Sequence, residues 1–411
     1  MVGAHPRAGL AQPPHPAAVG VHRTRTSKTG TTRRAVSSAP VRRNLGLAGL
    51  AWFLLIAAAI TAWWVFQPVL HDAADSDLTL VYIGARIGLE HGWSHIYSLD
   101  LQHQLFTQLR PGAPFGDGER FLSPPPLAWL TVPLTFIGSV GAFYAWLVLS
   151  LAALVAAWWL AAPGAGVLRS LWLIGALAWY PVLYSLSLGQ PAMVVLLAVA
   201  AAWWLAEAGR PYLAGAVLGL SVVKPQLAFA LPAVLLVAGR WRIAAAWAVT
   251  AAILAGVSLI AIGAQGLSDY RSLLTEAQTV TNNRYFTLAY LLGPGTLSYV
   301  AAAAIAAIAL VGAYLNRGAG LARLFTLGLV AGALSATYWH LQDFAILVLA
   351  AWLFWRDNPP GWQRAWLLVV ALAGELAWPL SPLPILIAIA VWFAFLVVPA
   401  RTSLPTAVPA A

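Results

Sequence analysis

The sequence of 411 residues has no cysteine and very little charge. Without cysteine, neither a disulfide nor thiolate chemistry contributes to this protein. Only 9% of the residues are charged and 61% are hydrophobic, with a mean hydropathy of +0.78. A water-soluble globule does not sustain such a composition, so the sequence predicts an integral membrane protein.

The alternating ten-residue segments that are typical of transmembrane strands are also missing. Apolar runs of spanning length recur instead, and helices satisfy the backbone polar groups of such runs within lipid. We therefore predict an all-α polytopic bundle of about 12 transmembrane helices. The expected crossings are 46–66, one within 121–161, 170–187, 191–206, 211–223, 226–239, 243–263, 295–315, 320–337, 341–355, 365–378 and 383–399.

Both ends of the chain lack long apolar runs. Residues 1–45 contain eight basic residues and no Asp or Glu, which predicts a disordered cytoplasmic tail that could contact anionic lipid headgroups. No folded basic face accompanies these charges, so nucleic acid is not an expected partner. Residues 46–399 form the expected transmembrane domain, and residues 400–411 form a short cytoplasmic tail.

Basic residues are scarce in the loops that we predict to be external. With the N-terminus inside, nine arginines of later loops join the tail, so 17 of the 23 basic residues lie in the cytoplasm. A second crossing within 121–161 would reverse this pattern, so we take "SPPPLAWLTVPLTFIG" as an interfacial or re-entrant piece before one crossing. The chain is therefore expected in the cytoplasmic membrane, with residues 67–120 as its first external loop.

Polar residues collect on the predicted external face. The stretch "DSDLTLVYIGARIGLEHGWSHIY" at 75–97 lies there, with "SLGQP", "VKPQ", "SDYRSLLTEAQTVTNNRYF" and "TYWHLQDF" from later loops. Any one of these groups could simply cap a helix or contact headgroups. Their convergence on one face favours a functional site.

The stretch 78–91 is expected to be a helix. Leu78, Val81, Tyr82, Ala85 and Leu89 recur at helical spacing, as in an amphipathic helix lying on the membrane with Asp77 at its N-terminal end. The alternative is a surface helix that packs against neighbouring spans.

Lys224 is one of only two lysines in the chain, and it interrupts an apolar run. A charge there costs on the order of 3 kcal/mol on insertion scales unless it snorkels or pairs. Pro225 would break the helix beside it. Lys224 could therefore snorkel to headgroups from a short connection, or it could be a cation aimed at a lipid phosphate.

The order of these segments resembles family 87 glycosyltransferases of the GT-C superfamily. The matching segments are "DLTLVYIGARIGLEHG...IY", "FLSPPPLAWLTVPL", "LGQPAMVVLLAVAAAWWLAEAGRPYLAGAVLGLSVVKPQ" and "TYWHLQDF", over roughly residues 75–350. The resemblance implies transfer of a sugar, most often mannose, from a polyprenyl-phosphate donor on the outer face of the membrane. A glycolipid or glycan is the expected acceptor, although a protein would meet the same outward cavity.

The resemblance also assigns roles to residues. The family uses an aspartate of the first external loop as base, which matches Asp77, although Asp75 two residues earlier could take the role. "TYWHLQDF" lacks the Ser-Pro expected before the histidine.

Transfer from a phosphate needs a base near the attacking hydroxyl and cations near the leaving phosphate, whereas a second carboxylate as general acid is unnecessary. Lys224 and Arg86 are the expected phosphate-binding cations. The remaining candidates, expected to contact the substrate, are His340, Gln190, Asp343 and Tyr82. A lone D-x-D is too little to predict a metal, and no cofactor is expected.

Two other classes remain open from the residues alone. A secondary transporter or lipid flippase would use Lys224 and Asp343 as coupling charges, but no internal repeat supports it. A noncatalytic assembly subunit would tolerate replacement of Asp77. An assay with a labelled polyprenyl-phosphate sugar separates the three.

Overall fold

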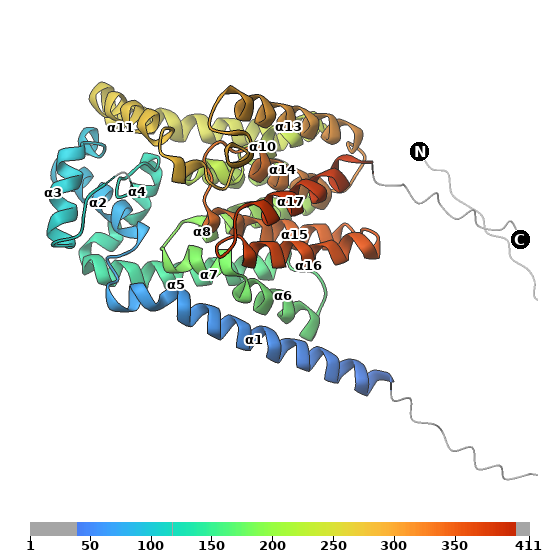
Figure 1. Ribbon diagram of the computed structural model, residues 1–411. Helices are drawn as coiled ribbons and strands as arrows, with labels where there is room; N and C mark the ends of the chain where they lie inside the picture. Colours follow the sequence, from blue (N-terminus) through green and yellow to red (C-terminus); the bar gives the residue numbers. More distant parts are fainter. Residues whose placement is uncertain (1–38, 117, 400–411) are drawn as a thin grey trace, which may run out of the picture. The chain divides into compact units, whose positions relative to one another are not determined.

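The computed structural model describes residues 39–116 and 118–399, and every regular element in these ranges is a helix (Figure 1). The all-α prediction is therefore confirmed. Contacts divide the chain into Met1–Leu45 and Gly46–Ala411, and the site described below lies within the second part. The predicted tails fall almost wholly outside the described residues and stay predictions.

Nine α-helices lie within the described residues up to 219. The first group is α1 (Ala39–His71), α2 (Asp77–Glu90), α3 (Leu99–Leu109), α4 (Pro125–Thr131) and α5 (Gly138–Ala161), with 3-10 turns η1 (Trp93–His95) and η2 (Val132–Ile137). It is followed by α6 (Gly166–Ala178), α7 (Tyr180–Ser187), α8 (Ala192–Glu207) and α9 (Pro211–Gly219). Helix α1 begins seven residues before the predicted span, since Pro40 suits a first helical turn.

The C-terminal half begins with two 3-10 turns, η3 (Leu220–Val223) and η4 (Pro225–Leu227). The following elements are α10 (Ala230–Val237), α11 (Trp241–Ala277), η5 (Thr281–Arg284), α12 (Ala289–Leu292), α13 (Thr296–Leu315), α14 (Leu321–Ser335), η6 (Leu341–Ile346), α15 (Leu347–Arg356), α16 (Gly361–Leu376) and α17 (Leu383–Val397). Helix α11 continues past the predicted span because Gly263, at φ 62°, lets the chain bend and resume a helix.

Fewer helices could cross a membrane alone than the sequence predicted. By length and composition, four helical stretches of the described chain qualify: Gly46–His71, Pro125–Ala161, Trp241–Ala277 and Thr296–Leu315. Helices α6 and α7 add a fifth if the pair, bent by 61°, is one span. The count of about 12 is not confirmed, because several predicted crossings are shorter helices interrupted by 3-10 turns.

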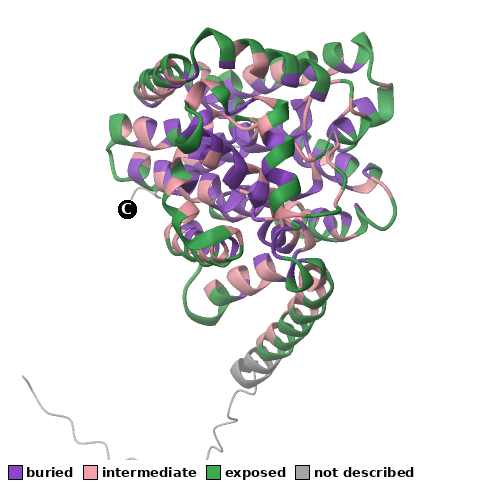
Figure 2. Ribbon diagram, turned by 90° about the vertical axis from the view of Figure 1, so that its left-hand side faces the viewer, coloured by how far each residue is buried: buried purple, intermediate pink, exposed green. Residues whose placement is uncertain are grey.

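Large apolar side chains are exposed on the peripheral helices, whereas α14 is buried from Ala322 to Ser335. Trp64, Phe136 and Ile260 are among the exposed ones. Figure 2 shows the buried residues in the interior with exposed helices around them. This distribution suits a protein that is surrounded by lipid, where an apolar exterior carries no penalty. The chain is thus a multi-pass membrane protein.

Helix α2 differs from the amphipathic surface helix that the sequence predicted. Ile83 and Ile87, on the side opposite the predicted apolar stripe, are also buried, and α3, α4 and α5 contact the helix. Gly84 and Gly88 allow the rings of Phe121 and Trp93 to approach closely. Helix α2 is therefore packed inside the protein, which corrects the prediction that it lies on the membrane.

Candidate active site

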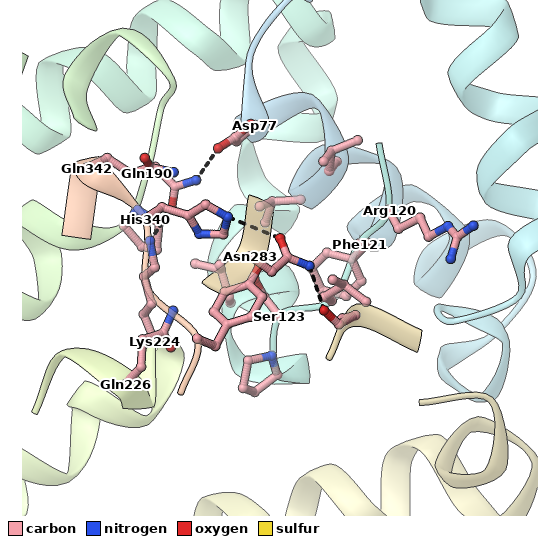
Figure 3. A pocket seen from close by; sticks show the side chains of 18 of the residues that line it. Asp77, Arg120, Phe121, Ser123, Gln190, Lys224, Gln226, Asn283, His340 and Gln342 are labelled. Atoms are coloured by element: carbon pink, nitrogen blue, oxygen red, sulfur yellow. Dashed lines mark hydrogen bonds between the residues drawn. The ribbon is translucent and has the colours of Figure 1, made fainter. Parts of the chain in front are cut away.

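Six separate segments line a cavity of about 680 Å³. They include the start of α2, the turn after α7, the break around Lys224, and the far end of α11 with the loop that follows it. The lining residues fall within 77–81, 118–127, 184–191, 223–226, 270–283 and 338–342. The predicted convergence of these polar segments is therefore present in the structure (Figure 3).

Four side chains form a continuous chain of polar contacts at the cavity wall. The Nε2 group of Gln190 donates a hydrogen bond to Oδ2 of Asp77, and Oε1 of Gln190 accepts one from Nζ of Lys224. The same ammonium forms an ion pair with Oδ1 of Asp343. One carboxylate and one ammonium thus share a chamber, linked by a single amide.

Asp77 owes its position to the start of α2. It is the first residue of that helix, and the backbone N–H of the next residue, Leu78, donates to the carbonyl of Leu188 at 3.1 Å. Gly189 has φ +66°, and a Cβ there would lie 2.7 Å from Cβ of Leu78. Only glycine fits this close approach, which sets Gln190 beside the carboxylate.

Lys224 lies where the chain stops being helical. It separates η3 from η4 with φ −146° and ψ 77°, as expected for a residue that precedes a proline. Its side chain is only 10% exposed, and its two partners within the described ranges are Gln190 and Asp343. The ammonium therefore does not reach out to headgroups, as the snorkelling alternative requires.

Asp343 is the ion-pair partner of Lys224. Its side chain is fully buried, and its Oδ2 accepts from the backbone N–H of His340 at 3.1 Å. Since a buried charge is costly unless paired, Asp343 and Lys224 depend on one another. Asp343 does not line the cavity, so its expected contact with substrate is replaced by contact with Lys224.

His340 lines the cavity and is held by the loop after α11. Nε2 of His340 lies 3.1 Å from Oδ1 of Asn283, whose Nδ2 donates to the carbonyl of Ala277 at 2.9 Å. Because the amide oxygen can only accept, this arrangement places the ring proton on Nε2. Burial lowers the pKa of His340, so the ring is neutral at pH 7.

Burial also acts on the carboxyl group at the start of α2. Desolvation raises the pKa of Asp77 above its ordinary value of 3.8. The hydrogen bond from Gln190 and the charge of Lys224 oppose this rise, whereas Asp343 adds to it. A carboxylate with a raised pKa is a better proton acceptor than an exposed one.

Three predicted site residues lie elsewhere. Asp75 pairs with Arg110, with Oδ1 and Nη1 2.8 Å apart, and does not line the main cavity. Arg86 forms an ion pair with Glu90 of the same helix. Tyr82 is buried, and its hydroxyl donates to the carbonyl of Thr135 at 3.4 Å. The structure therefore does not bring Asp75, Arg86 or Tyr82 to the cavity.

The cavity also contains residues that the sequence did not single out. Arg120 lies on the side away from Lys224 (Figure 3), and its Nη1 is 2.7 Å from Oε2 of Glu276. Asn283, Gln226 and Gln342 add amides to the lining. The sequence offered one signal, the polar loop 268–286, but spacing alone did not identify Asn283.

The described part of the chain contains no group of three or more His, Asp or Glu side chains that could hold a metal ion. Asp75 and Asp77 do not converge, because Asp75 is drawn to Arg110 and Asp77 to Gln190. The D-x-D pair is therefore divided between two environments.

Comparison with known proteins decides the family. The model of glycosyltransferase family 87 matches residues 121–382, which is more than half of the chain. The chain belongs to glycosyltransferase family 87. Four residues of the site, Gln190, Lys224, His340 and Asp343, lie within the matched segment, whereas Asp77 precedes it. No curated protein and no solved structure matches the chain.

Membership of family 87 makes this chain a membrane glycosyltransferase. Such an enzyme needs a sugar donor and an acceptor, and the cavity is the place where a carboxylate, an ammonium and several amides meet. A volume of about 680 Å³ lies within the usual range of small-molecule sites.

Proposed function

We propose that this family 87 enzyme transfers a hexose, with mannose as the first candidate, from a polyprenyl phosphate to an acceptor hydroxyl. The observation that carries the proposal is the presence of Asp77 and Lys224 in one cavity, joined through Gln190. The acceptor would be a glycolipid or glycan, reached from the outer face of the cytoplasmic membrane.

Asp77 acts as the base in this reaction. The acceptor oxygen attacks the anomeric carbon, the bond from that carbon to the phosphate oxygen breaks, and the bonding electrons leave with the phosphate. The hydroxyl proton goes to the carboxylate of Asp77. Because phosphate is a good leaving group, the reaction does not need a second carboxyl group as acid.

Lys224 binds the phosphate and stabilises the charge that develops on it. The ammonium is held in place before substrate arrives, because Asp343 and Gln190 fix it. A pre-oriented cation in a site of low dielectric stabilises a developing anion more than a mobile surface cation does. His340, which is neutral and lines the same cavity, contacts the sugar hydroxyls.

The distribution of arginines supports an outward-facing cavity. Arg356 donates to the carbonyl of Ala161 at 2.7 Å, and Arg240 donates to that of Ala319 at 3.3 Å. These contacts lie beyond the ends of α5, α10, α13 and α15 that are remote from the cavity-lining loops. Under the positive-inside rule, the arginine ends face the cytoplasm and the cavity faces outward.

The test is an assay of purified protein in lipid nanodiscs with radiolabelled polyprenyl-phosphate-mannose and a glycolipid extract as acceptor. We expect Asp77→Asn to lower the transfer rate roughly 10²- to 10⁴-fold, the usual contribution of general base catalysis. Asp75→Asn is the matched control, since Asp75 lies nearby but pairs with Arg110.

Three results would contradict the proposal. Full activity of Asp77→Asn together with loss of activity in Asp75→Asn would assign the role of base to Asp75 instead. Movement of label across the membrane without covalent transfer would favour a transporter. Transfer from another polyprenyl-phosphate sugar, with none from the mannose donor, would show that the transferred sugar is not mannose.

A further inference from the structure

Gln190 connects the two charged groups of the cavity and has no freedom in how it does so. A lysine ammonium can only donate hydrogen bonds and a carboxylate can only accept them. The amide oxygen must therefore face Lys224 and the amide nitrogen must face Asp77, as the structure has them. Reversing the amide would break both contacts at once.

The backbone around Gln190 is also fixed. Its own N–H donates to the carbonyl of Ser185 at 3.0 Å, and the N–H of Gly189 donates to that of Leu186 at 3.1 Å. The neighbouring bond from Leu78 to Leu188 ties this turn to the start of α2. The amide and the carboxylate thus belong to one rigid unit.

An amide between the two charges has a different effect from a direct ion pair. In direct contact, Lys224 would neutralise Asp77, and each would be occupied by the other instead of by substrate. With Gln190 between them, Lys224 takes its counter-charge from the buried Asp343. Asp77 receives a hydrogen bond from Gln190 and only the field of the more distant ammonium, so it keeps more of its basicity than in a direct ion pair.

We infer that Gln190 is a positioning residue that couples the occupancy of the anion site at Lys224 to the proton-accepting strength of Asp77. The inference rests on the proposed function, in which a phosphate binds Lys224 and Asp77 takes the proton. When an anion neutralises Lys224, the favourable field at Asp77 weakens, and the carboxylate becomes more basic as the donor binds.

Several charged or titratable groups face Asp77 and belong to this balance. Among the described residues they are Lys224, Asp343, Asp75, Tyr184 and Tyr338. None of these groups is changed in Gln190→Met or Gln226→Met, so a difference in pH dependence between these two variants reports the loss of the Gln190 amide.

The first test compares the pH dependence of Gln190→Met with that of Gln226→Met. Both substitutions remove an amide from the same cavity, but Gln226 makes no described contact with Asp77. Without the donated hydrogen bond, the acid limb of kcat in Gln190→Met should move up by about 1 to 2 pH units. Gln226→Met should leave the acid limb where it is in the wild type.

A second test needs no turnover. Farnesyl phosphate is titrated into the protein by calorimetry, in buffers of different ionisation enthalpy, to count the protons taken up on binding. Farnesyl phosphate itself titrates at about pH 6, so its own proton exchange contributes to the count in every variant. We expect more protons to be taken up by the wild type, as the anion reaches Lys224, than by Asp77→Asn. In Gln190→Met, the pH at which uptake is largest should move upward.

The outcomes separate this inference from the proposed function. If the wild type transfers sugar and Asp77→Asn does not, but Gln190→Met keeps the wild-type acid limb, the coupling is wrong and the function stands. Equal proton uptake by the wild type and Asp77→Asn at saturation, or absence of farnesyl phosphate binding, would also overturn the coupling. Failure of transfer in the wild type would instead refute the function. Thermal unfolding of each variant shows whether it is folded.

Discussion

Two buried cations in this protein, Lys224 and Arg323, have different surroundings. As whole residues they are 8% and 4% exposed, and each has one aspartate partner, Asp343 or Asp357. By burial and charge alone the two would be equivalent. What distinguishes them is how many of their hydrogen bonds the protein itself satisfies.

Arg323 lies at the start of α14 and is surrounded by acceptors. Its guanidinium donates to Oδ1 of Asn316, to Asp357 and to the carbonyls of three residues at the end of α17, namely Phe395, Leu396 and Val398. These contacts use all three nitrogens, so Arg323 fastens α17 to α14 and α15.

Lys224, in contrast, has only two described partners and lines a cavity. An ammonium has three donors, so this arrangement leaves one direction for a ligand. A buried cation therefore indicates a site when it faces a cavity and the protein satisfies only some of its hydrogen-bond donors.

The largest effect expected from this comparison is on catalysis. The double substitution Lys224→Met with Asp343→Asn removes both charges, while the asparagine keeps an acceptor for the backbone N–H of His340. Folding should persist, since replacing a whole buried pair is often tolerated. Transfer should fall roughly 10²- to 10³-fold, as for loss of one transition-state donor. A rate close to wild type in the nanodisc assay would refute the role of Lys224.

Arg323→Met should have the opposite profile. It leaves the buried side of Asp357 without its cation and removes the guanidinium donor from the carbonyls of Phe395 and Val398, which should lower the free energy of unfolding by about 3–5 kcal/mol. The specific activity of the folded fraction should stay near that of the wild type. Thermal unfolding in detergent, with activity normalised to folded protein, checks this. If transfer fell without loss of stability, Arg323 would not be purely structural.

The pH dependence tests the carboxylate. Asp77 accepts a proton only when ionised, and burial raises its pKa, so activity should be lost on acidification at a higher pH than an exposed aspartate would give. Below that pKa, the rate should fall about tenfold per pH unit. The residual activity of Asp77→Asn should lack this limb. Persistence of the limb in that variant would assign it to another group.

The smallest effects compare two arginines near the site. Arg120→Gln should raise KM about tenfold, the effect of one weakened ionic contact, because Arg120 lines the cavity. Arg86→Gln should leave KM unchanged and lower stability by only about 0.3–0.5 kcal/mol, the contribution of an i, i+4 pair. Steady-state kinetics with both variants decides between them. A larger change in KM in Arg86→Gln than in Arg120→Gln would support the sequence-based hypothesis that Arg86 binds the donor phosphate.

Most of the helices were predictable because apolar runs and prolines mark their bounds. The break at Lys224 followed from Pro225, and the helix after Asp77 followed from its periodicity. The burial of α2 was not predictable, because it depends on Gly84 and Gly88 accepting rings from distant segments. The number of crossings is not confirmed, because the prediction judged length from composition without the 3-10 interruptions that divide several helices.

Only part of the membership of the candidate site was predictable. Asp77, Gln190, Lys224 and Asp343 stood out as polar groups in apolar surroundings. Their order of contact did not, since it depends on three-dimensional proximity between segments more than 100 residues apart. Arg120 and Asn283 were missed because nothing in their local sequence separates them from ordinary loop residues.

The backbone hydrogen bond from Leu78 to Leu188 makes the site sensitive to mutation in a distant part of the sequence. The position of Asp77 depends on a turn that lies more than a hundred residues later in the chain. Gly189→Ala removes no polar group from the cavity, yet it should impair proton transfer because it misaligns Asp77 and Gln190. The proposed proton transfer at the start of α2 therefore requires glycine at position 189, in a different part of the sequence.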